Sequence, residues 1–491
     1  MGHLGDKADL TPSPLKGSGS NRGCLTGETY DFVRSYGICS NRAGFSHPPD
    51  APSKPLQPLD GENGAERNRT AVRNTGVSHL VRGKPDSFIV AADQDSRRVG
   101  ITEPKQAETI DAVAIVSGGL EGVAADELAA LGARGLRPLQ RAVSFQVDRA
   151  GFYRLHLQAR LPFRILRQMA RFPCRSREEL YAGIQQCLDW QSWLPPSRSF
   201  RVDVTGSSPG LRHSHFCALQ AKNALIDLQQ VLWGERSSIN LQAPDLVLHL
   251  HLGGNHASLS FDSSTTSLHR RGYRAAMGLA PLKENLAAGL IDLTGWNGQI
   301  PLADPLCGSG TLLIEAASKQ LGHAPGLGLA DVQQAALQQW PDFNAALWRQ
   351  ELDKARALAV DHQENGTKLA PILGMDQEAS VINQAQSNIA SANVANWIEI
   401  RQGDFRDFHP PEGPGIIVCN PPYGKRLGDI NTLEELYSDL GAMAKQRCSG
   451  WQLWLLSGNP TLTRALRMKA SRRIPVSNGG MDCRWLRYDI H

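Results

Sequence analysis

The residues best suited to chemistry form the tetrapeptide Asn420-Pro421-Pro422-Tyr423, which follows the apolar run Ile416–Cys419. The run predicts a buried strand, and the two prolines stop it at its carboxyl end. Because proline fixes φ and has no N–H donor, the backbone carbonyls of this corner are held rigidly and stay free to accept hydrogen bonds. An amide oxygen, a fixed carbonyl and an aromatic ring together suit a site that grips a planar amine and stacks its ring. Taken alone, the motif could also be a turn that merely ends a strand.

A second candidate site follows the strand predicted at 300–303. The segment Asp304–Thr311 places glycines at Gly308 and Gly310, together with Cys307, directly before a helix predicted at 312–319. Glycines let a ligand approach the backbone, and the free N–H groups at the start of a helix face it. The segment therefore predicts a nucleotide or adenosyl cradle. It lacks the Gly-Lys-Ser/Thr of a phosphate-binding loop, and it is not the G-x-G-x-x-G of a dinucleotide site.

Two further strands also end in acidic residues. Asp376 closes the strand predicted at 371–375, and Asp404 with Phe405 follows the strand predicted at 397–401. A carboxylate at such a position can accept both hydroxyls of a ribose or an adenine amino group, and Phe405 can pack on the ring. Any one of these carboxylates could be a surface turn residue. Since carboxyl ends of parallel strands meet at one edge of a sheet, all of them together with Asn420 indicate one site.

The elements that position these residues follow an α/β pattern. From residue 300 onward strands and helices alternate, and a strand at 451–456 precedes a closing hairpin of 466–474 and 483–488 through Asn478-Gly479-Gly480. Upstream, strands at 113–116 and 143–147 with helices at 120–131, 152–157 and 163–169 predict a small strand-helix-strand-helix sandwich. A second small unit is predicted from helices at 180–187 and 216–233, a strand at 200–204 and a hairpin of 246–252 and 257–261. In that hairpin His249 and His251 alternate with leucines, so we expect both on the solvent face.

Composition favours an intracellular, cytoplasmic protein. The chain has 491 residues, a net charge of +4 and nine cysteines without a C-x-x-C pair. That cysteine pattern argues against a zinc site or a disulfide framework, and no apolar run is long enough for a membrane span. Residues 1–109 are polar and unpatterned, which predicts a disordered tail. A tail that touches RNA through its arginines, or a start assigned upstream of the true one, are alternatives. An insertion at 323–365 is predicted to be mostly helical.

Two basic segments are candidates for nucleic-acid contacts. The first contains Arg270, Arg271, Tyr273 and Arg274, which can contact phosphate and stack a base. A solvated linker between domains is the alternative for this segment. The second contains Arg464, Arg467, Lys469, Arg472 and Arg473. Its alternative is a hairpin edge that charge protects from pairing with other strands.

With these motifs placed, the chain from about residue 112 to its end resembles the THUMP-containing RNA guanine-N2 methyltransferases, especially the bacterial 23S rRNA type (RlmL). The resemblance rests on Ser117–Glu121, Leu268–Arg274, Ala280–Glu284, Asp304–Ala317, Asn420–Leu427, Gly450-Trp451 and Gly480–Cys483. It implies a class I, Rossmann-like methyltransferase domain with a mixed seven-stranded sheet at 265–491. An α+β ferredoxin-like segment at 110–170 and an RNA-binding THUMP domain at 171–264 would precede it. Only the first catalytic half of members with two methyltransferase domains is covered.

The resemblance also implies roles for the residues named above. Asp304, Gly308 and Gly310, with Cys307 and Thr311, would hold the amino-acid end and backbone side of S-adenosylmethionine, Asp376 its ribose, and Asp404 and Phe405 its adenine. Asn420 and the Pro421 carbonyl would accept the two N2 hydrogens of a guanine in 23S rRNA or a ribosomal assembly intermediate, beside Pro422 and Tyr423. No metal is required. The alternatives are a tRNA guanine-N2 methyltransferase, an adenine-N6 DNA methyltransferase, and a non-catalytic RNA-binding assembly factor.

Overall fold

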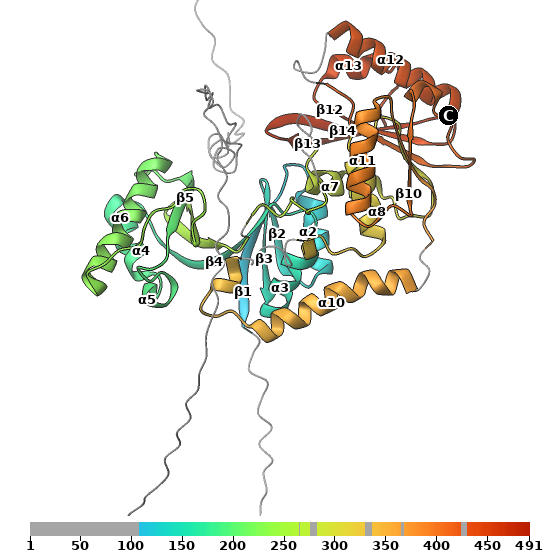
Figure 1. The fold of residues 1–491 in the computed structure, drawn as a ribbon. Helices are drawn as coiled ribbons and strands as arrows, with labels where there is room; N and C mark the ends of the chain where they lie inside the picture. Colours follow the sequence, from blue (N-terminus) through green and yellow to red (C-terminus); the bar gives the residue numbers. More distant parts are fainter. Residues whose placement is uncertain (1–107, 265, 275–281, 329–335, 365–367, 424–429) are drawn as a thin grey trace, which may run out of the picture. The chain divides into compact units, whose positions relative to one another are not determined.

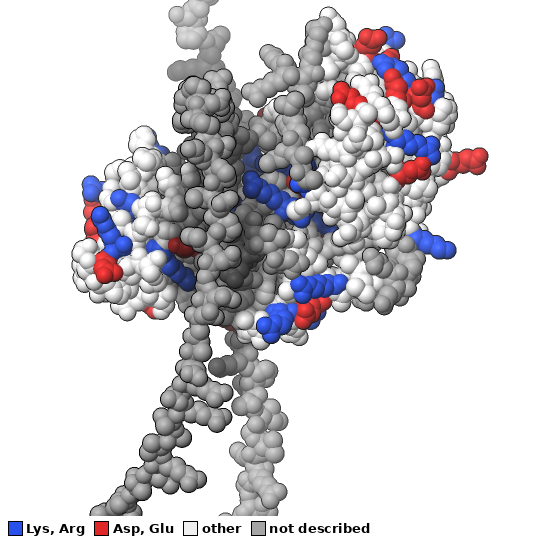
Figure 2. All heavy atoms as spheres, viewed as in Figure 1, with Lys and Arg blue, Asp and Glu red and all other residues white. Residues whose placement is uncertain are grey.

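The computed structural model describes residues 108–264, 266–274, 282–328, 336–364, 368–423 and 430–491 (Figure 1). The predicted tail lies outside these residues except at its last two positions, where Thr109 already opens the first strand. On the face seen in Figure 2, basic and acidic side chains are intermingled, which agrees with the small net charge of +4. Among the residues that the structure describes, no helix has both the length and the apolar character needed to cross a membrane.

The first sheet joins the two small units that the sequence predicted separately. Its seven strands lie in the order β2-β3-β1-β4-β7-β6-β5. They are β1 (Thr109–Ile115), β2 (Arg134–Leu139), β3 (Ala142–Asp148), β4 (Arg164–Pro173), β5 (Phe200–Ser207), β6 (Leu246–Gly253) and β7 (His256–Asp262). Strand β4 pairs with β1 on one side and with β7 on the other, so it carries the sheet from one unit into the next.

Two sequence predictions in this sheet are wrong. The segment 163–169 was predicted to be a helix, but it forms most of β4, where Ile165 and Leu166 are both buried and the register shifts between Gln168 and Ala170. Consecutive buried residues followed by a bulge imitate helical spacing. His249 was expected on the solvent face, but it is 3% exposed, whereas His251 on the same face of β6 is exposed as predicted. Burial lowers the pKa of His249 to about 3.

The helices of this part are α2 (Glu121–Ala130), α3 (Arg149–Gln158), α4 (Arg177–Gln186), α5 (Trp190–Trp193) and α6 (Ser214–Trp233). Three of them, α3, α4 and α5, start at a side-chain cap. The Asp148 carboxylate accepts the backbone N–H of Gly151, and the Ser176 hydroxyl accepts that of Glu179. Each bond satisfies a donor that the first helical turn leaves free.

The second sheet is the mixed seven-stranded sheet that the family resemblance implied, in the order β10-β9-β8-β11-β12-β14-β13. Its strands are β8 (Leu302–Asp304), β9 (Ile372–Asp376), β10 (Ile398–Gln402), β11 (Ile416–Cys419), β12 (Gln452–Ser457), β13 (Arg472–Asn478) and β14 (Met481–Asp489). The first five in space are parallel, and β14 returns antiparallel to β12 and pairs with β13 as a hairpin. Because the strand order reverses between β8 and β11, their carboxyl ends form the edge at which such sheets bind ligands.

Both faces of this sheet are covered by apolar clusters. Along β11, Ile416 and Val418 belong to one cluster, whereas Ile417 and Cys419 belong to the other. The helices of this domain are α7 (Glu284–Thr294), α8 (Thr311–Gln320), α11 (Ala379–Ser391), α12 (Ile430–Arg447) and α13 (Pro460–Ala465). Strands buried on both faces explain why the sequence shows continuous apolar runs here rather than alternation.

The insertion attaches the second domain to the first. It contains the short helix η1 (Ala336–Gln339) and the long helix α10 (Ala345–Glu364), which confirms its helical character. The Arg154 Nε on α3 lies 2.9 Å from an oxygen of the fully buried Glu351 carboxylate. The Tyr153 hydroxyl accepts the backbone N–H of Asn344 at 2.9 Å. The insertion therefore packs against the ferredoxin-like segment, a role that the sequence did not indicate.

A glycine turn makes a second contact between the domains. The backbone N–H of Ser477 in β13 donates to the Gly118 carbonyl at 2.9 Å. Gly119 has φ of 90°, and a Cβ at this position would lie 1.9 Å from the Pro475 carbonyl oxygen. Only glycine allows this approach, so the turn is shaped to dock on the closing hairpin.

Candidate active site

A cavity of about 790 Å³ lies at the carboxyl ends of β8, β9 and β11. Of the residues predicted to bind cofactor or do chemistry, ten line it: Asp304, Cys307, Gly308, Thr311, Asp376, Phe405, Asn420, Pro421, Pro422 and Tyr423. Gly310 and Asp404 are not among the lining residues. The two motifs that the sequence analysis started from thus meet in one cavity, as the parallel strand order requires.

The glycine loop after β8 is held by the end of β9. The Asp376 carboxylate accepts the backbone N–H groups of Gly308 and Glu378, each at 3.1 Å. Gly308 has φ of 53°, and nothing lies within 4 Å of the position that its Cβ would occupy. A ligand can therefore reach the backbone at Gly308. Gly310, with φ of 78°, is the residue before α8, and its missing Cβ faces Ala385 and other apolar side chains rather than the cavity.

Asp304 is a buried acid at the centre of this edge. Its side chain is 2% exposed, and one carboxylate oxygen accepts the backbone N–H of Leu306 at 3.1 Å. Burial raises the pKa of Asp304 to about 8, and the nearby charge of Asp376 adds to the shift. At neutral pH the carboxyl is therefore mostly protonated, and a cation placed beside it would draw it into the charged form.

The segment Asn420–Tyr423 contains a hydrogen-bond acceptor that has no donor among the described residues. The Asn420 Oδ1 atom is buried, and within the described parts of the chain it has no hydrogen-bond partner. A buried amide oxygen without a donor costs free energy, so a donor from a bound ligand would stabilise this atom. Asn420 lines the same cavity as Asp304 and the glycine loop.

Tyr423 is anchored by the tip of the closing hairpin. Its hydroxyl accepts a hydrogen bond from Asn478 Nδ2 at 2.7 Å and a longer one from Cys483 Sγ at 3.7 Å. Asn478 and Met481, the last paired residues of the hairpin, themselves line the cavity. The sequence predicted Asn478 only as part of a turn and indicated neither residue as a site residue. An Asn-Gly-Gly turn carries no signal that would separate the two roles.

The structure does not bring Asp404 into the cavity. Its carboxylate accepts both the backbone N–H of Arg406 at 2.9 Å and the Arg406 guanidinium at 2.8 Å. Asp404 thereby caps the short helix η2 (Phe405–Asp407). Phe405 and Arg406 do line the cavity, with the guanidinium 5.0 Å from the centre of the Phe405 ring.

The first basic segment is not one exposed patch, which corrects the sequence prediction. Arg271 and Tyr273 are 8% and 7% exposed, and both point to the buried Glu315 carboxylate. The Tyr273 hydroxyl donates to Glu315 Oε1 at 3.2 Å, and Arg271 Nε lies 3.7 Å from the same oxygen. The segment passes between packed domains, so the side chains of Arg271 and Tyr273 contact the protein interior.

The other two members of that segment are placed differently from each other. Arg270 is exposed. Arg274 lines the cavity, where it donates to the Thr311 hydroxyl at 3.0 Å and pairs with Glu284 at 2.8 Å. In the second basic segment, Arg472 and Arg473 are both exposed but alternate along β13, so the structure separates them on opposite faces of the hairpin.

Comparison with known proteins gives the family. Three family models match in succession: the RlmL ferredoxin-like domain at 111–166, the THUMP domain at 174–262, and the RMKL-like methyltransferase domain at 271–487. A Synechocystis sp. protein named "Putative RNA methyltransferase" is 42% identical over 378 residues, which cover 77% of this chain and 96% of that protein. The chain belongs to the THUMP-containing RNA methyltransferase family. S-Adenosylmethionine is the methyl donor of this family.

Two further family relatives bear on the architecture. A "Ribosomal RNA large subunit methyltransferase K/L" of Cellvibrio japonicus is 37% identical over 384 residues, or 76% of this chain and 50% of that protein. The chain thus spans about half the length of the K/L relatives that it matches. A crystal structure of "a putative methyltransferase complexed with SAH" superposes with a TM-score of 0.67 at 27% identity, covering 78% of this chain and 98% of that one. The predicted order of ferredoxin-like, THUMP and methyltransferase domains is confirmed.

Proposed function

We propose that this protein transfers a methyl group from S-adenosylmethionine to the exocyclic N2 of a guanine in RNA. The observation that carries the proposal is the buried Asn420 Oδ1 atom, which lines the same cavity as the glycine loop and has no partner among the described residues. The large-subunit rRNA in the names of the K/L relatives favours 23S rRNA as the substrate.

The residues around the glycine loop suit the cofactor. Asp304 is a buried carboxyl for which the described residues provide no cation, so it fits the α-ammonium group of the amino-acid end. Gly308 leaves room for close approach, and Asp376 keeps acceptor capacity for the ribose hydroxyls. The Phe405 ring offers a surface for the adenine. Asp404 is occupied by Arg406, so we do not assign it the adenine amine.

The cofactor supplies a methyl group already activated on a sulfonium, and the chain has to make the guanine amine nucleophilic. The N2 lone pair is delocalised into the ring. If the Asn420 side-chain oxygen and the Pro421 carbonyl accept both N2 hydrogens, they favour the pyramidal nitrogen over the planar one. The same two bonds aim the nitrogen at the methyl group, and such positioning contributes several kcal/mol to lowering the barrier.

We infer that Tyr423 stacks the target base. A base flipped out of RNA loses stacking, and an aromatic ring in the pocket restores part of it. The hydrogen bond from Asn478 fixes the Tyr423 ring at one wall of the cavity. We therefore assign Asn478 as a positioning residue that acts through Tyr423.

Nucleoside analysis tests the proposal. The purified protein is incubated with S-adenosylmethionine carrying a labelled methyl group and, in separate reactions, with total RNA or genomic DNA from a strain that lacks the gene, and the nucleosides are separated. Labelled N2-methylguanosine in 23S rRNA supports the proposal, and the same nucleoside in tRNA would move it to the tRNA alternative. Labelled N6-methyladenine from DNA, or no transfer to any nucleic acid, would overturn it.

A further inference from the structure

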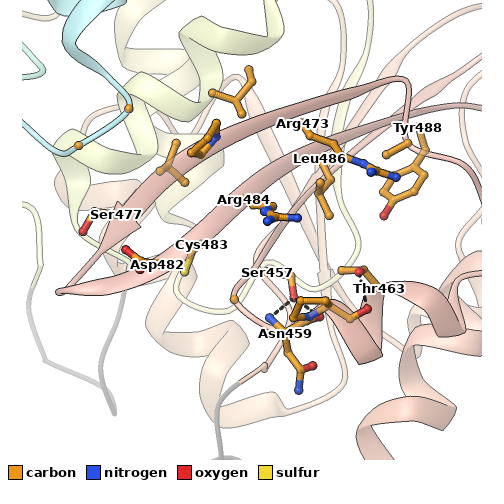
Figure 3. A pocket seen from close by; sticks show the side chains of 18 of the residues that line it. Ser457, Asn459, Thr463, Arg473, Ser477, Asp482, Cys483, Arg484, Leu486 and Tyr488 are labelled. Atoms are coloured by element: carbon orange, nitrogen blue, oxygen red, sulfur yellow. Dashed lines mark hydrogen bonds between the residues drawn. The ribbon is translucent and has the colours of Figure 1, made fainter. Parts of the chain in front are cut away.

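A second cavity of about 880 Å³ lies beside the active site and is lined by both domains. One face of the β13–β14 hairpin forms its floor, and it is flanked by the segment from Ser457 to Thr463 and by the Gly118-Gly119 turn with Arg141. We call this cavity the hairpin groove. Figure 3 shows Arg473 and Arg484 on the hairpin, with Ser457, Asn459 and Thr463 on the neighbouring segment.

The strand register decides which hairpin residues face the groove. Arg473 pairs with Leu486, and Arg484 pairs with Pro475, two positions along. Because side chains alternate between the faces of a strand, all four lie on the groove side. Arg472 lies on the opposite face, although it is exposed and adjacent in sequence.

The groove carries unpaired positive charge. Four arginines line it, namely Arg141, Arg464, Arg473 and Arg484. In the described parts of the chain none of their guanidinium groups has an ion pair or a hydrogen bond. Elsewhere in the same domain an exposed arginine does have a carboxylate partner, as Arg401 has Glu399, and the half-buried Arg487 pairs with Asp489. The lack of a carboxylate partner therefore distinguishes the four groove arginines from Arg401 and Arg487.

The acidic groups of the groove are fewer and partly engaged. The Glu121 carboxylate accepts the backbone N–H groups of Gly119 at 2.7 Å and of Arg141 at 2.9 Å, which fixes the turn that presents the Arg141 side chain. Arg141 has a φ of 59°, a left-handed conformation that few residues other than glycine adopt. The hydrogen bond from its backbone N–H to Glu121 helps to hold this conformation. Asp482 is the other acidic residue in the groove. Four guanidinium groups against two carboxylates leave the groove positive.

The hairpin tip is the shared wall between the groove and the active-site cavity. The last pair of the hairpin, Asn478 with Met481, lines the active-site cavity, and the preceding pair, Ser477 with Asp482, lines the groove. Asn478 also holds the Tyr423 hydroxyl. A chain lying in the groove would thus end next to the residue that we assign to stacking the target base.

We propose that the hairpin groove binds the RNA strand adjacent to the target guanine, with its phosphates paired to Arg141, Arg464, Arg473 and Arg484. Several unpaired guanidinium groups in one groove match the repeated phosphates of a single strand better than one small anion. The inference rests on the proposed function and deepens it. It also gives the ferredoxin-like segment a part in substrate binding through Arg141.

The test compares variants of the full chain for binding to a fluorescein-labelled oligouridylate of about 20 nucleotides at about 50 to 200 mM salt. The groove variant combines Arg464→Ala, Arg473→Ala and Arg484→Ala. The single variant Arg473→Ala is measured as well, and Arg472→Ala on the other hairpin face is its matched control. The affinity falls as salt rises, and each lost phosphate contact makes this negative slope of log affinity against log salt shallower by about 0.7. We therefore expect the slope of the groove variant to be shallower than that of wild type by about 2. At low salt its affinity should drop by roughly tenfold or more, and Arg472→Ala should bind as wild type.

Two further measurements keep the outcomes distinct. Affinity for S-adenosylhomocysteine reports whether the groove variant is folded, and the single variant Arg464→Ala on α13 replaces it if that affinity is lost. Equal RNA affinity and salt slope in wild type and folded variant would overturn the groove proposal and leave the proposed function standing. A loss with Arg472→Ala as large as with Arg473→Ala would also overturn it. If the wild type binds no RNA, the proposed function fails as well.

Discussion

Replacing Asp304 by Asn separates the effect of this buried carboxyl on the free energy of unfolding from its effect on the affinity for S-adenosylmethionine. The carboxyl is 2% exposed, and burial raises its pKa to about 8 from an ordinary value of 3.8. Asparagine keeps nearly the same shape and keeps an acceptor for the Leu306 N–H, but it cannot become charged. The variant should therefore be at least as stable as wild type while it binds S-adenosylmethionine more weakly.

The pH dependence has a definite sign. Below pH 3.8 the carboxyl is protonated in both the folded and the unfolded chain, so its contribution to stability is fully present there. Above that pH the unfolded chain loses the proton and the folded chain keeps it, so wild-type stability falls by about 1.4 kcal/mol per pH unit from this group. The fall ends once the pH passes about 8. Other acids with raised pKa, such as Glu127, contribute equally to both proteins and cancel in the difference.

Urea unfolding of both proteins at several pH values between about 5 and 9 measures this difference. We expect the free-energy advantage of Asp304→Asn to grow with pH and to level off above pH 8. Calorimetry with S-adenosylhomocysteine should show a loss of about 1.5–3 kcal/mol, or roughly tenfold to a hundredfold in affinity, because a charge-assisted hydrogen bond is removed. A free-energy advantage of Asp304→Asn that does not change with pH would refute the conclusion that Asp304 is buried in its neutral form. An unchanged affinity would refute its role at the ammonium group.

Three other substitutions test the supports of the site. Gly119→Ala places a methyl group against the Pro475 carbonyl, where the closest approach is 1.9 Å, and should lower the melting temperature; a melting temperature equal to wild type would contradict the docking. Glu315→Ala leaves two buried guanidinium groups without their carboxylate and should cost about 3–5 kcal/mol of unfolding free energy in urea, with a cost near zero as the contrary result. Tyr423→Phe removes the bond from Asn478, worth about 1 kcal/mol, and should lower kcat/KM for RNA by roughly fivefold without changing cofactor affinity. Unchanged RNA kinetics would show that the ring is positioned by packing alone.

The sequence predicted the parts of the site that lie at strand ends. Asp304, Asp376 and Asn420 each follow a short apolar run that proline or a polar turn interrupts, and parallel strands bring such ends together. It did not predict Asn478, because the bond to Tyr423 joins residues 55 positions apart and a turn sequence does not indicate what its side chain meets.

The failures have related causes. Arg271 and Tyr273 are polar and were assigned to the surface, but the segment runs between domains where Glu315 provides a buried partner. Helical spacing at 163–169 came from a bulged interior strand. Asp404 has the expected position after its strand, but its neighbour Arg406 occupies the carboxylate. The first two outcomes depend on tertiary contacts that local pattern does not encode, whereas the Asp404–Arg406 pair is local and joins residues two positions apart.

The central claim is that the Asn420 oxygen activates and aims the target amine. The most direct measurement is the single-turnover rate of methyl transfer to RNA by Asn420→Ala, together with its affinity for S-adenosylhomocysteine. We predict that the rate falls by about 10²–10³-fold or more, as for the loss of one preorganised polar group, while cofactor affinity stays within about threefold of wild type. A variant that folds, binds the cofactor and methylates RNA at the wild-type rate would contradict the account.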